Sequence, residues 1–278
     1  MPNKSEFTNQ IEQFFSEPYT ITNGFKVPEI KDVPLFNHGI EMDLSILFID
    51  IKESTKIVDE SRRQTAARMY KSFLWGVAQI ARTNNGELRS FNGDGVLVVF
   101  ANDQKENNAV RSAFQMAWFV KEILKPKIQP RIEGNSNLQS MDFDFGIGID
   151  TGKVLVIRGG IKGDTNNDLV WVGNPANYAV KLSGLSKGSS SSTFITQDVY
   201  TKLGENLKYI KTVSQMFKGI PLPPIVDKKP VWERALLISN QPRFAPLNLA
   251  SLRQNQPSQQ PQRVIPCYYK SKCFIEIH

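Results

Sequence analysis

The segment SFNGDGVLVVF, residues 90–100, restricts the fold more than any other part of the chain. Gly93 and Gly95 flank Asp94, and glycine and aspartate in this arrangement are typical of a tight turn. The segments ELRSF before the turn and VLVVF after it are rich in the residues that strands prefer. The sequence therefore predicts a β-hairpin that holds an acidic residue at its turn.

Strand-like and helix-like patterns alternate around this hairpin. The β-branched and aromatic residues of DLSILFIDI, residues 43–51, predict a buried strand, and the apolar spacing over 55–84 predicts a long helix. A second helix is predicted over 107–124, with Pro126 as its stop. FDFGIGID is expected to form a strand with GKVLVIRGG as its hairpin partner, and Pro175 begins a third helix. This order predicts an α+β or α/β fold.

Composition divides the chain into three parts. Residues 1–42 combine a short amphipathic stretch with prolines and read as an N-terminal arm, whereas residues 43–238 carry the strand and helix patterns. Residues 239–278 are rich in Gln, Pro, Asn and Ser and are expected to form a weakly structured polar extension. No apolar run approaches the roughly 20 residues of a membrane span, and no secretory signal is visible. A cytoplasmic location is expected.

Charge and rare residues narrow the chemistry. The chain has 34 Lys and Arg against 27 Asp and Glu, a net charge of +7 that is spread along the sequence. This pattern suits a small anionic substrate and is weak evidence for nucleic acid, which usually needs a basic stripe. Two cysteines near the C-terminus give no disulfide framework or zinc spacing. Of the two histidines, His38 and His278, neither is placed for catalysis within the predicted domain.

A second acidic residue, Asp50, ends the strand 43–51 and is followed by the polar segment IKESTKI. The helix that starts there presents free backbone N–H groups, so residues 51–55 could cradle a phosphate; alternatively, Ser54 and Thr55 only cap the helix. If the strand lies beside the hairpin, Asp50 and Asp94 meet at one end of the sheet. Two neighbouring carboxylates repel unless a cation lies between them, which favours a two-metal phosphoryl-transfer site.

Four motifs, LFIDIKEST, FNGDGVLVVF, GIGIDTGKVLVIRGG and WVGNPANYAVKLS, occur in the order typical of the class III nucleotide cyclase catalytic domain. The chain resembles this family over about residues 43–238. The resemblance implies a ferredoxin-like βαββαβ fold of the α+β class, with helices packed on an antiparallel or mixed sheet. It also implies the conversion of a nucleoside triphosphate into a 3′,5′-cyclic monophosphate and pyrophosphate.

The resemblance assigns roles to individual residues. Asp50 and Asp94, with the carbonyl of Ile51, would hold two divalent cations, Mg²⁺ or Mn²⁺. Asn177 would orient the ribose, and Lys181 takes the place of an arginine that stabilises the transferring phosphate; the two residues lie one helical turn apart. The triphosphate would be contacted by Lys52, Glu53, Ser54, Thr55 and Lys218. Because the metal-binding and Asn/Lys halves come from two domains in this family, a head-to-tail homodimer with two composite sites is expected.

The selection of the nucleotide base depends on other residues than the metal and phosphate sites. Purine cyclases carry charged or polar pairs at two places, which are Ser90 and Val170 here, so neither usual purine pair is present. The candidate base-pocket residues are Arg89, Ser90, Val170 and Trp171, although the last two could equally belong to the core. The segment DLVWVGNPANYAVKLS resembles stand-alone bacterial pyrimidine cyclases of antiphage (Pycsar-type) signalling, whose product activates a separate effector. UTP is therefore expected, with CTP possible.

The sequence alone leaves two alternative functions open. An adenylate cyclase with an unusual base pocket shares all the metal and phosphate arguments. A non-catalytic, nucleotide-sensing cyclase homology domain would need neither turnover nor two metal ligands, so the presence of both aspartates and Asn177 favours an enzyme.

Overall fold

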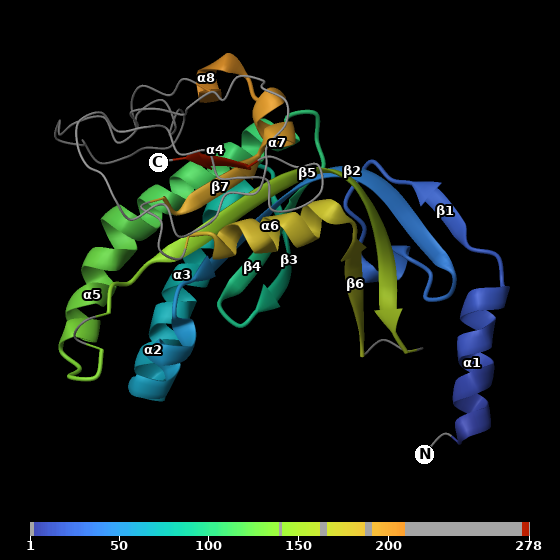
Figure 1. Ribbon diagram of the computed structural model, residues 1–278, viewed down its shortest axis with the longest axis horizontal. Helices are drawn as coiled ribbons and strands as arrows, with labels where there is room; N and C mark the ends of the chain where they lie inside the picture. The colour runs from blue at the N-terminus through green and yellow to red at the C-terminus, as the bar shows by residue number, and fades with distance from the viewer. Residues whose placement is uncertain (1–2, 139–140, 162–165, 187–190, 209–273, 278) are drawn as a thin grey trace, which may run out of the picture.

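The computed structural model describes residues 3–138, 141–161, 166–186, 191–208 and 274–277. These residues form one mixed sheet with helices on both of its faces (Figure 1). The strands are β1 (Thr20–Asn23), β2 (His38–Ile51), β3 (Glu87–Asn92), β4 (Gly95–Phe100), β5 (Phe145–Gly160), β6 (Asn167–Val172), β7 (Thr193–Thr196) and β8 (Phe274–Ile277). The helices are α1 (Lys4–Ser16), η1 (Ile30–Asp32), α2 (Ser54–Glu60), α3 (Arg63–Thr83), α4 (Lys105–Trp118), η2 (Phe119–Leu124), α5 (Lys125–Glu133), α6 (Asn174–Gly184), α7 (Gln197–Thr201) and α8 (Glu205–Lys208).

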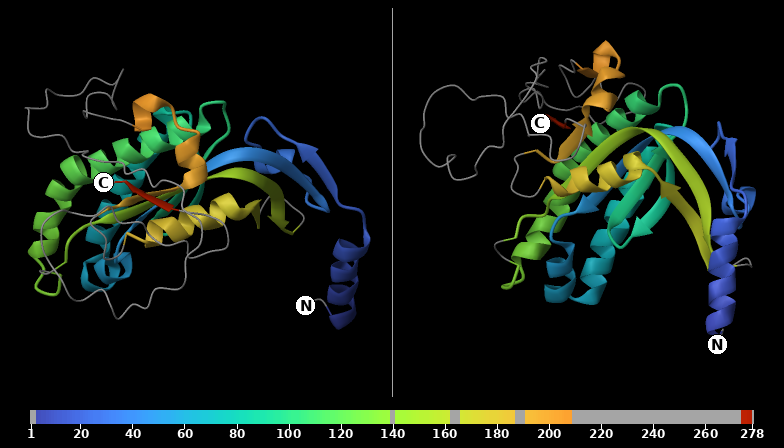
Figure 2. Two further views of the ribbon diagram at one scale, coloured as in Figure 1. Left: turned by 45° about the horizontal axis from the view of Figure 1, so that its top comes forward. Right: turned by 45° about the vertical axis from the view of Figure 1, so that its right-hand side comes forward.

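The strand order confirms the predicted α+β class. The central path of the sheet runs β3-β4-β2-β5-β7-β8, with β1 beside β2 and β6 beside β5. The first four strands of this path, with the helices between them, have the ferredoxin-like βαββαβ order, and their neighbouring pairs are antiparallel. Beyond them β7 runs parallel to β5, so the whole sheet is mixed. Strands β2 and β5 continue past this core into a curved extension flanked by β1 and β6 (Figure 2).

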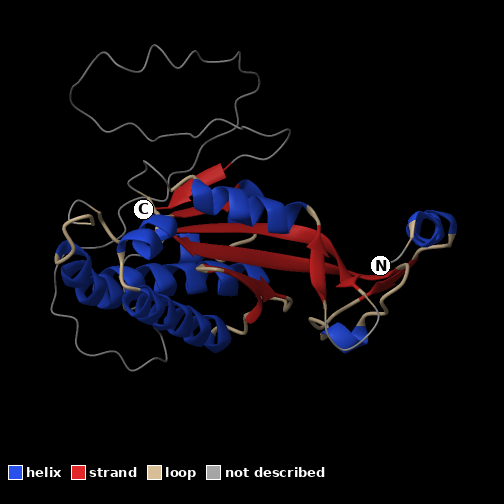
Figure 3. Cartoon of the chain, turned by 90° about the horizontal axis from the view of Figure 1, so that it is seen from below, coloured by secondary structure: helices blue, strands red, loops and turns tan. Residues whose placement is uncertain are grey.

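The two faces of the sheet are covered differently. Helices α2 to α5 cover one face, here called the helix-rich face, where the core includes Phe73, Phe100 and Phe145. The opposite face carries α6 and is called the α6 face; its core includes Phe48 and Val156. Figure 3 shows the sheet lying between these two layers. Successive side chains of a strand point to opposite faces of the sheet. Because a core covers each face, β2 and β4 are apolar on both.

Two helix boundaries differ from the sequence predictions. The helix expected over residues 55–84 is two helices, because the backbone is extended at Ser61 and Arg62 between α2 and α3. The helix expected to stop at Pro126 continues from α4 through the π-helical turn η2 into α5. Pro126 lies just after the π-helical turn, and the backbone before it stays helical, so this proline does not end the helix.

Two strand predictions were also wrong. The hairpin expected over residues 143–160 does not form, because β5 runs as a single long strand whose partner along most of its length is β2. Residues 274–277, in the segment expected to be weakly structured, form β8 and pair with β7. Residues 274–277 of the C-terminal segment therefore contribute an edge strand to the sheet.

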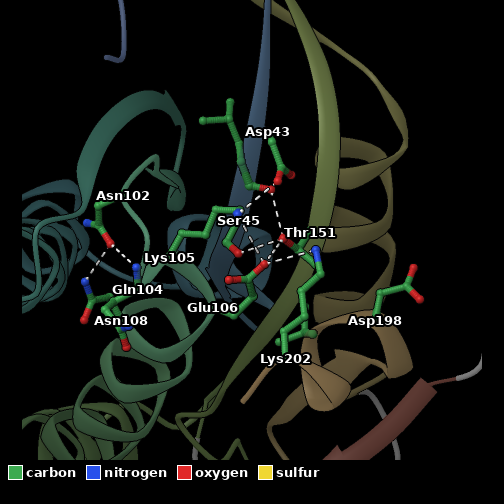
Figure 4. Close-up of polar contacts among 12 residues, drawn as sticks. Asp43, Ser45, Asn102, Gln104, Lys105, Glu106, Asn108, Thr151, Asp198 and Lys202 are labelled. Atoms are coloured by element: carbon green, nitrogen blue, oxygen red, sulfur yellow. Dashed lines mark hydrogen bonds and ion pairs between the residues drawn. The ribbon is translucent and has the colours of Figure 1, made fainter. Parts of the chain in front are cut away.

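A buried polar cluster holds α4 and α7 against the sheet. The Glu106 side chain is only 7% exposed; its Oε1 accepts a hydrogen bond from Thr151 Oγ1 at 2.8 Å and lies 3.3 Å from Lys202 Nζ and 3.5 Å from Lys105 Nζ (Figure 4). Burial alone would lower the pKa of Lys105, but Asp43 and Glu106 raise it overall. The cluster pairs a buried charge with two cations and a hydroxyl, as such charges require.

None of the helices in the described ranges is both long and apolar enough to cross a membrane.

Candidate active site

The structure brings Asp50 and Asp94 to the same place. Ile49 of β2 pairs with Val96 of β4, so Asp50 lies beside the β3–β4 turn that contains Asp94. Asp94 Oδ2 accepts a hydrogen bond from the backbone N–H of Ile51 at 3.1 Å. This bond fixes one carboxylate against the backbone that immediately follows the other.

The two glycines of the turn have separate structural reasons. Gly93 has a φ of +66°, a conformation that glycine adopts without strain. A Cβ on Gly95 would lie 2.5 Å from the Phe48 ring, so any other residue there would have to displace this ring. The first glycine permits the turn and the second permits its close packing on β2. Together they place Asp94 beside Ile51.

Tyr70 of α3 is a site residue that the sequence analysis missed. Its hydroxyl is 3.4 Å from the carbonyl oxygen of Ser54. Burial raises the pKa of the Tyr70 hydroxyl, the bond to Ser54 lowers it, and the charges of Asp94 and Asp50 raise it further. Both carboxylates therefore act electrostatically on one phenol. Tyr70 carries no signal in the sequence, because its spacing is that of any half-buried helical residue.

The loop after β2 has its own anchor. Lys52, expected to contact the triphosphate, places its Nζ 2.6 Å from Asp144 Oδ2, and its backbone N–H donates to the Asp144 carbonyl at 2.9 Å. Glu53 has a φ of +54° and begins α2, with Ser54 half-buried and Thr55 exposed. The Lys52 ammonium thus holds the loop to the start of β5. Lys218 lies outside the described residues.

The donor set at this end of the sheet fits divalent cations. Asp50 and Asp94 offer carboxylate oxygens and Ile51 a carbonyl, which are the hard ligands that Mg²⁺ and Mn²⁺ bind. In the ranges that the structure describes, no group of three or more Asp, Glu, His or Cys side chains could hold a metal by itself. The set therefore suits a cation that is bound by few protein groups and completed by phosphate oxygens and water.

Asn177 and Lys181 lie on the exposed side of α6, one turn apart as predicted. The Lys181 ammonium lies 5.8 Å from the centre of the Tyr178 ring. The buried side of α6 packs closely on β5, because a Cβ on Gly148 would lie 2.0 Å from the Ala179 carbonyl oxygen and one on Gly146 would lie 2.1 Å from the Ser183 oxygen. These glycines set the height of Asn177 and Lys181 above the sheet.

We expect Gly148→Ala to destabilise the protein by about 1–3 kcal/mol and to lower turnover, because the added methyl group must push α6 off β5. Gly184→Ala is the matched control: it lies at the end of the same helix, and a Cβ there has no neighbour within 4 Å. Thermal melts and steady-state rates of both variants check this expectation. Equal stability of the two variants would contradict the close-packing account.

A β-bulge shapes the first pair of candidate base-pocket residues. Leu88 pairs with Val98 and Ser90 with Leu97, so Arg89 is the extra residue between them. Ser90 faces the α6 face with its partner Leu97, and the Arg89 guanidinium is bound by Glu87 on β3 and lies 3.2 Å from Glu29 Oε1. Because of the bulge, the side chains of the neighbouring residues 89 and 90 can lie on the same face of the sheet. In a regular strand they would point to opposite faces.

The second pair is split by the pleat of β6. Trp171 pairs with Val156 and packs on the core of the α6 face, whereas Val170, 45% exposed, points to the other side. Val170 therefore does not share a face with Ser90.

Within the described part of the chain, Arg89 Nε and Trp171 Nε1 are two of three buried side-chain polar atoms that have no hydrogen-bond partner. Buried donors without a protein partner are rare in folded proteins.

The fold and the paired carboxylates define a domain of the nucleotidyl cyclase type, and comparison with known proteins agrees. The model of the adenylate and guanylate cyclase catalytic domain matches residues 39–219, so this chain belongs to the class III nucleotidyl cyclase family. The match begins within the expected arm and ends before residue 238, the expected domain boundary.

Several curated relatives are uridylate cyclases. The one from Xanthomonas perforans is 35% identical over 206 residues, which cover 74% of this chain and 85% of the relative. The one from Burkholderia cepacia is 34% identical over 205 residues, covering 73% and 85%.

Solved structures support the fold alone. A class III adenylyl cyclase-like ATP-binding protein from Pseudomonas aeruginosa has a TM-score of 0.53 at 17% identity. A bacterial light-regulated adenylyl cyclase has a TM-score of 0.51 at 19% identity. The matches cover 77% and 60% of this chain but only 47% and 46% of those longer chains.

Proposed function

We propose that this nucleotidyl cyclase converts UTP into 3′,5′-cyclic UMP and pyrophosphate, with CTP as a second substrate. The observation that carries the proposal is the similarity, at 34–35% identity over nearly three quarters of the chain, to proteins named uridylate cyclase. Ser90 and Val170, at the two places where purine cyclases carry their base-reading pairs, support it. Both positions lack the usual purine pair, and Val170 points away from the α6 face.

The reaction forms a bond between the ribose 3′-oxygen and the α-phosphorus, breaks the bond between the α-phosphorus and the oxygen that bridges to the β-phosphorus, and passes the 3′-hydroxyl proton to water. When bound at Asp50, Asp94 and the Ile51 carbonyl, two divalent cations supply the charge that lowers the pKa of the 3′-hydroxyl and stabilises the leaving pyrophosphate. The N–H of Ile51 holds the Asp94 carboxylate in place for this role. The backbone of residues 52–55 faces the triphosphate, in a loop held by the Lys52–Asp144 ion pair.

The residues of α6 act on the sugar and the reacting phosphate. The Asn177 amide hydrogen-bonds the ribose ring and holds the 3′-hydroxyl in line with the α-phosphorus. The Lys181 ammonium neutralises charge on the α-phosphate as the bond order changes. As a point charge, it lacks the bidentate geometry of arginine. Asp50 and Asp94 of one copy and Asn177 and Lys181 of a second copy complete each site, which makes the active species a head-to-tail homodimer.

Two buried donors on the α6 face suit a pyrimidine with carbonyl groups. Uracil presents two carbonyl oxygens, and Arg89 Nε and Trp171 Nε1 are N–H donors that lack partners. The segment around η1 connects them, because Glu29, the N-cap of η1, binds Arg89 and η1 contacts β6. We assign Trp171 and Arg89 to base recognition, with Ser90 beside them.

We expect Trp171→Phe to lower kcat/KM for UTP about tenfold, because it removes one hydrogen-bond donor from the base while keeping most of the ring volume. The low rate with ATP should change little. Val172→Ala is the control, since Val172 is the next residue of β6 and points to the opposite side. Rates with UTP and ATP in parallel check the effect. An equal loss for both nucleotides would remove Trp171 from base recognition.

The cyclic nucleotide is, on this proposal, a second messenger of antiphage defence that activates a separate effector protein. Support comes from the resemblance of DLVWVGNPANYAVKLS to antiphage pyrimidine cyclases. Phage challenge of cells that carry the intact chain with its native genomic neighbours tests the role. Protection that survives loss of cyclase activity would contradict it.

A further inference from the structure

Helix α1 is held in a defined position although it covers nothing. Its N-terminus has a capping box in which Glu6 N–H donates to Asn3 Oδ1 at 3.0 Å and Asn3 N–H donates to Glu6 Oε2 at 2.9 Å. At its other end, Asn37 Nδ2 donates to the carbonyl oxygens of Phe14 and Glu17 at 3.2 and 2.9 Å. The N-terminus of the helix is therefore capped, and its C-terminal end is fixed to the segment before β2.

The apolar side of α1 is open to solvent. No residue of the helix is buried, although Phe7, Ile11, Phe14 and Phe15 follow the i, i+4, i+7, i+8 spacing of one helical stripe. Phe15 is 86% exposed, and Phe14 stacks on Phe36 with ring centres 5.0 Å apart. A 13-residue helix is only marginally stable in water unless its apolar stripe is covered. The stripe therefore indicates a surface that covers it.

The negative charge of residues 1–25 argues against an anionic membrane or nucleic acid as the partner of α1. Residues 1–25 contain one lysine and three glutamates and carry a net charge of −2. Because the whole chain carries +7, the residues after 25 carry +9. Membrane-surface helices are rich in Lys and Arg on their polar side, and an acidic helix is repelled by anionic lipid and by nucleic acid. The matching partner is a basic protein surface with an exposed apolar residue.

Helix α3 carries such a surface. Arg68, Lys71, Trp75 and Arg82 follow one face of the helix at i, i+3, i+7 and i+14 and are all exposed, and Trp75 is 65% exposed. Figures 1 and 2 show α1 projecting from the far end of β1, away from α3 of the same chain. The α3 surface that α1 can reach is therefore that of another molecule.

We propose that α1 of one copy docks its apolar stripe on the exposed face of α3 of a second copy, around Trp75. Opposite charge brings the two helices together, and the phenylalanines bury against the indole. The proposal rests on the proposed homodimer and adds to it an arm that is exchanged between copies. The arm lies outside the paired carboxylates and α6, so it tightens the dimer without touching substrate.

Cross-linking tests the contact directly. In the intact chain with Cys267→Ser and Cys273→Ser, separate Ser16→Cys and Gln79→Cys proteins, which keep Phe15 and Trp75 and change exposed neighbours of each, are mixed and treated with a short bismaleimide. We expect a covalent dimer from this mixture and none from Ser16→Cys mixed with Ile123→Cys, an exposed position on η2. A cross-link formed within one chain of the Ser16→Cys, Gln79→Cys double variant, or no cross-link in the mixture, would overturn the proposal.

Dimer affinity separates this proposal from the function itself. Phe15→Asp should raise the dimer dissociation constant at least tenfold in analytical ultracentrifugation, with Ile123→Asp as control, and turnover should return once the concentration exceeds that constant. An unchanged dissociation constant overturns the docking of α1 and leaves the cyclase proposal standing. A wild-type chain that is monomeric and inactive at all concentrations overturns the composite site, and with it the basis of this proposal.

Discussion

Asp94→Asn is expected to lower cyclic nucleotide formation about 1000-fold while leaving the fold intact. Loss of a charged ligand removes several kcal/mol of stabilisation from the developing charge, and each 1.4 kcal/mol is worth about tenfold in rate. Asparagine retains a carbonyl oxygen that can accept the Ile51 N–H bond now made by Asp94 Oδ2, so the turn should keep its shape. Asp50→Asn is expected to cause a loss of the same order.

Single-turnover rates with UTP and Mn²⁺, together with thermal melts, measure this effect. Asp103→Asn is the matched control, because Asp103 is an exposed acid just beyond the opposite end of β4. An Asp94→Asn variant that melts like the wild type and retains more than a tenth of its activity would show that this carboxylate is not a metal ligand.

Two inactive variants should restore activity when they are combined. An Asp94→Asn chain lacks the metal half of the site and an Asn177→Ala chain lacks the ribose half. In a mixed head-to-tail dimer, one site receives both substitutions and the other receives neither. If subunits exchange freely, half of the dimers are mixed and each has one intact site of two, so about a quarter of wild-type activity should return.

Mixing the two purified variants tests the recovery of about a quarter. Co-expression of differently tagged chains and two-step purification isolate the mixed dimer alone, for which about half of wild-type activity is expected, since one of its two sites is intact. Asp94→Asn combined with Asp50→Asn is the control, because both substitutions fall in the same half and no intact site can form. Equal recovery in both combinations, or none in either, would show that each chain builds its site alone.

The convergence of Asp50 and Asp94 was predictable because it follows from local signals. The strand 43–51 ends at one acid, the turn of the hairpin contains the other, and neighbouring strands pair in most sheets. The pairing of Ile49 with Val96 confirms this geometry. The roles of the two residues as ligands stay predictions, as do those of Asn177 and Lys181.

Features that depend on contacts between distant segments were not predictable. Asp144 lies 92 residues from the lysine that it binds, and Tyr70 reaches the acids only because α3 packs beside the loop. The bulge at Arg89 leaves no mark in the composition of β3. Pro126 was misread as a stop because nothing in the composition marks the π-helical turn before it, through which the helix continues.

The most direct test of the account is to incubate the purified chain with ATP, GTP, CTP and UTP in equal amounts with Mn²⁺ and to separate the products by mass. Cyclic UMP as the main product, with cyclic CMP second, is the predicted result. Cyclic AMP or cyclic GMP as the main product would contradict the reading of Ser90, Arg89 and Trp171 as a pyrimidine site.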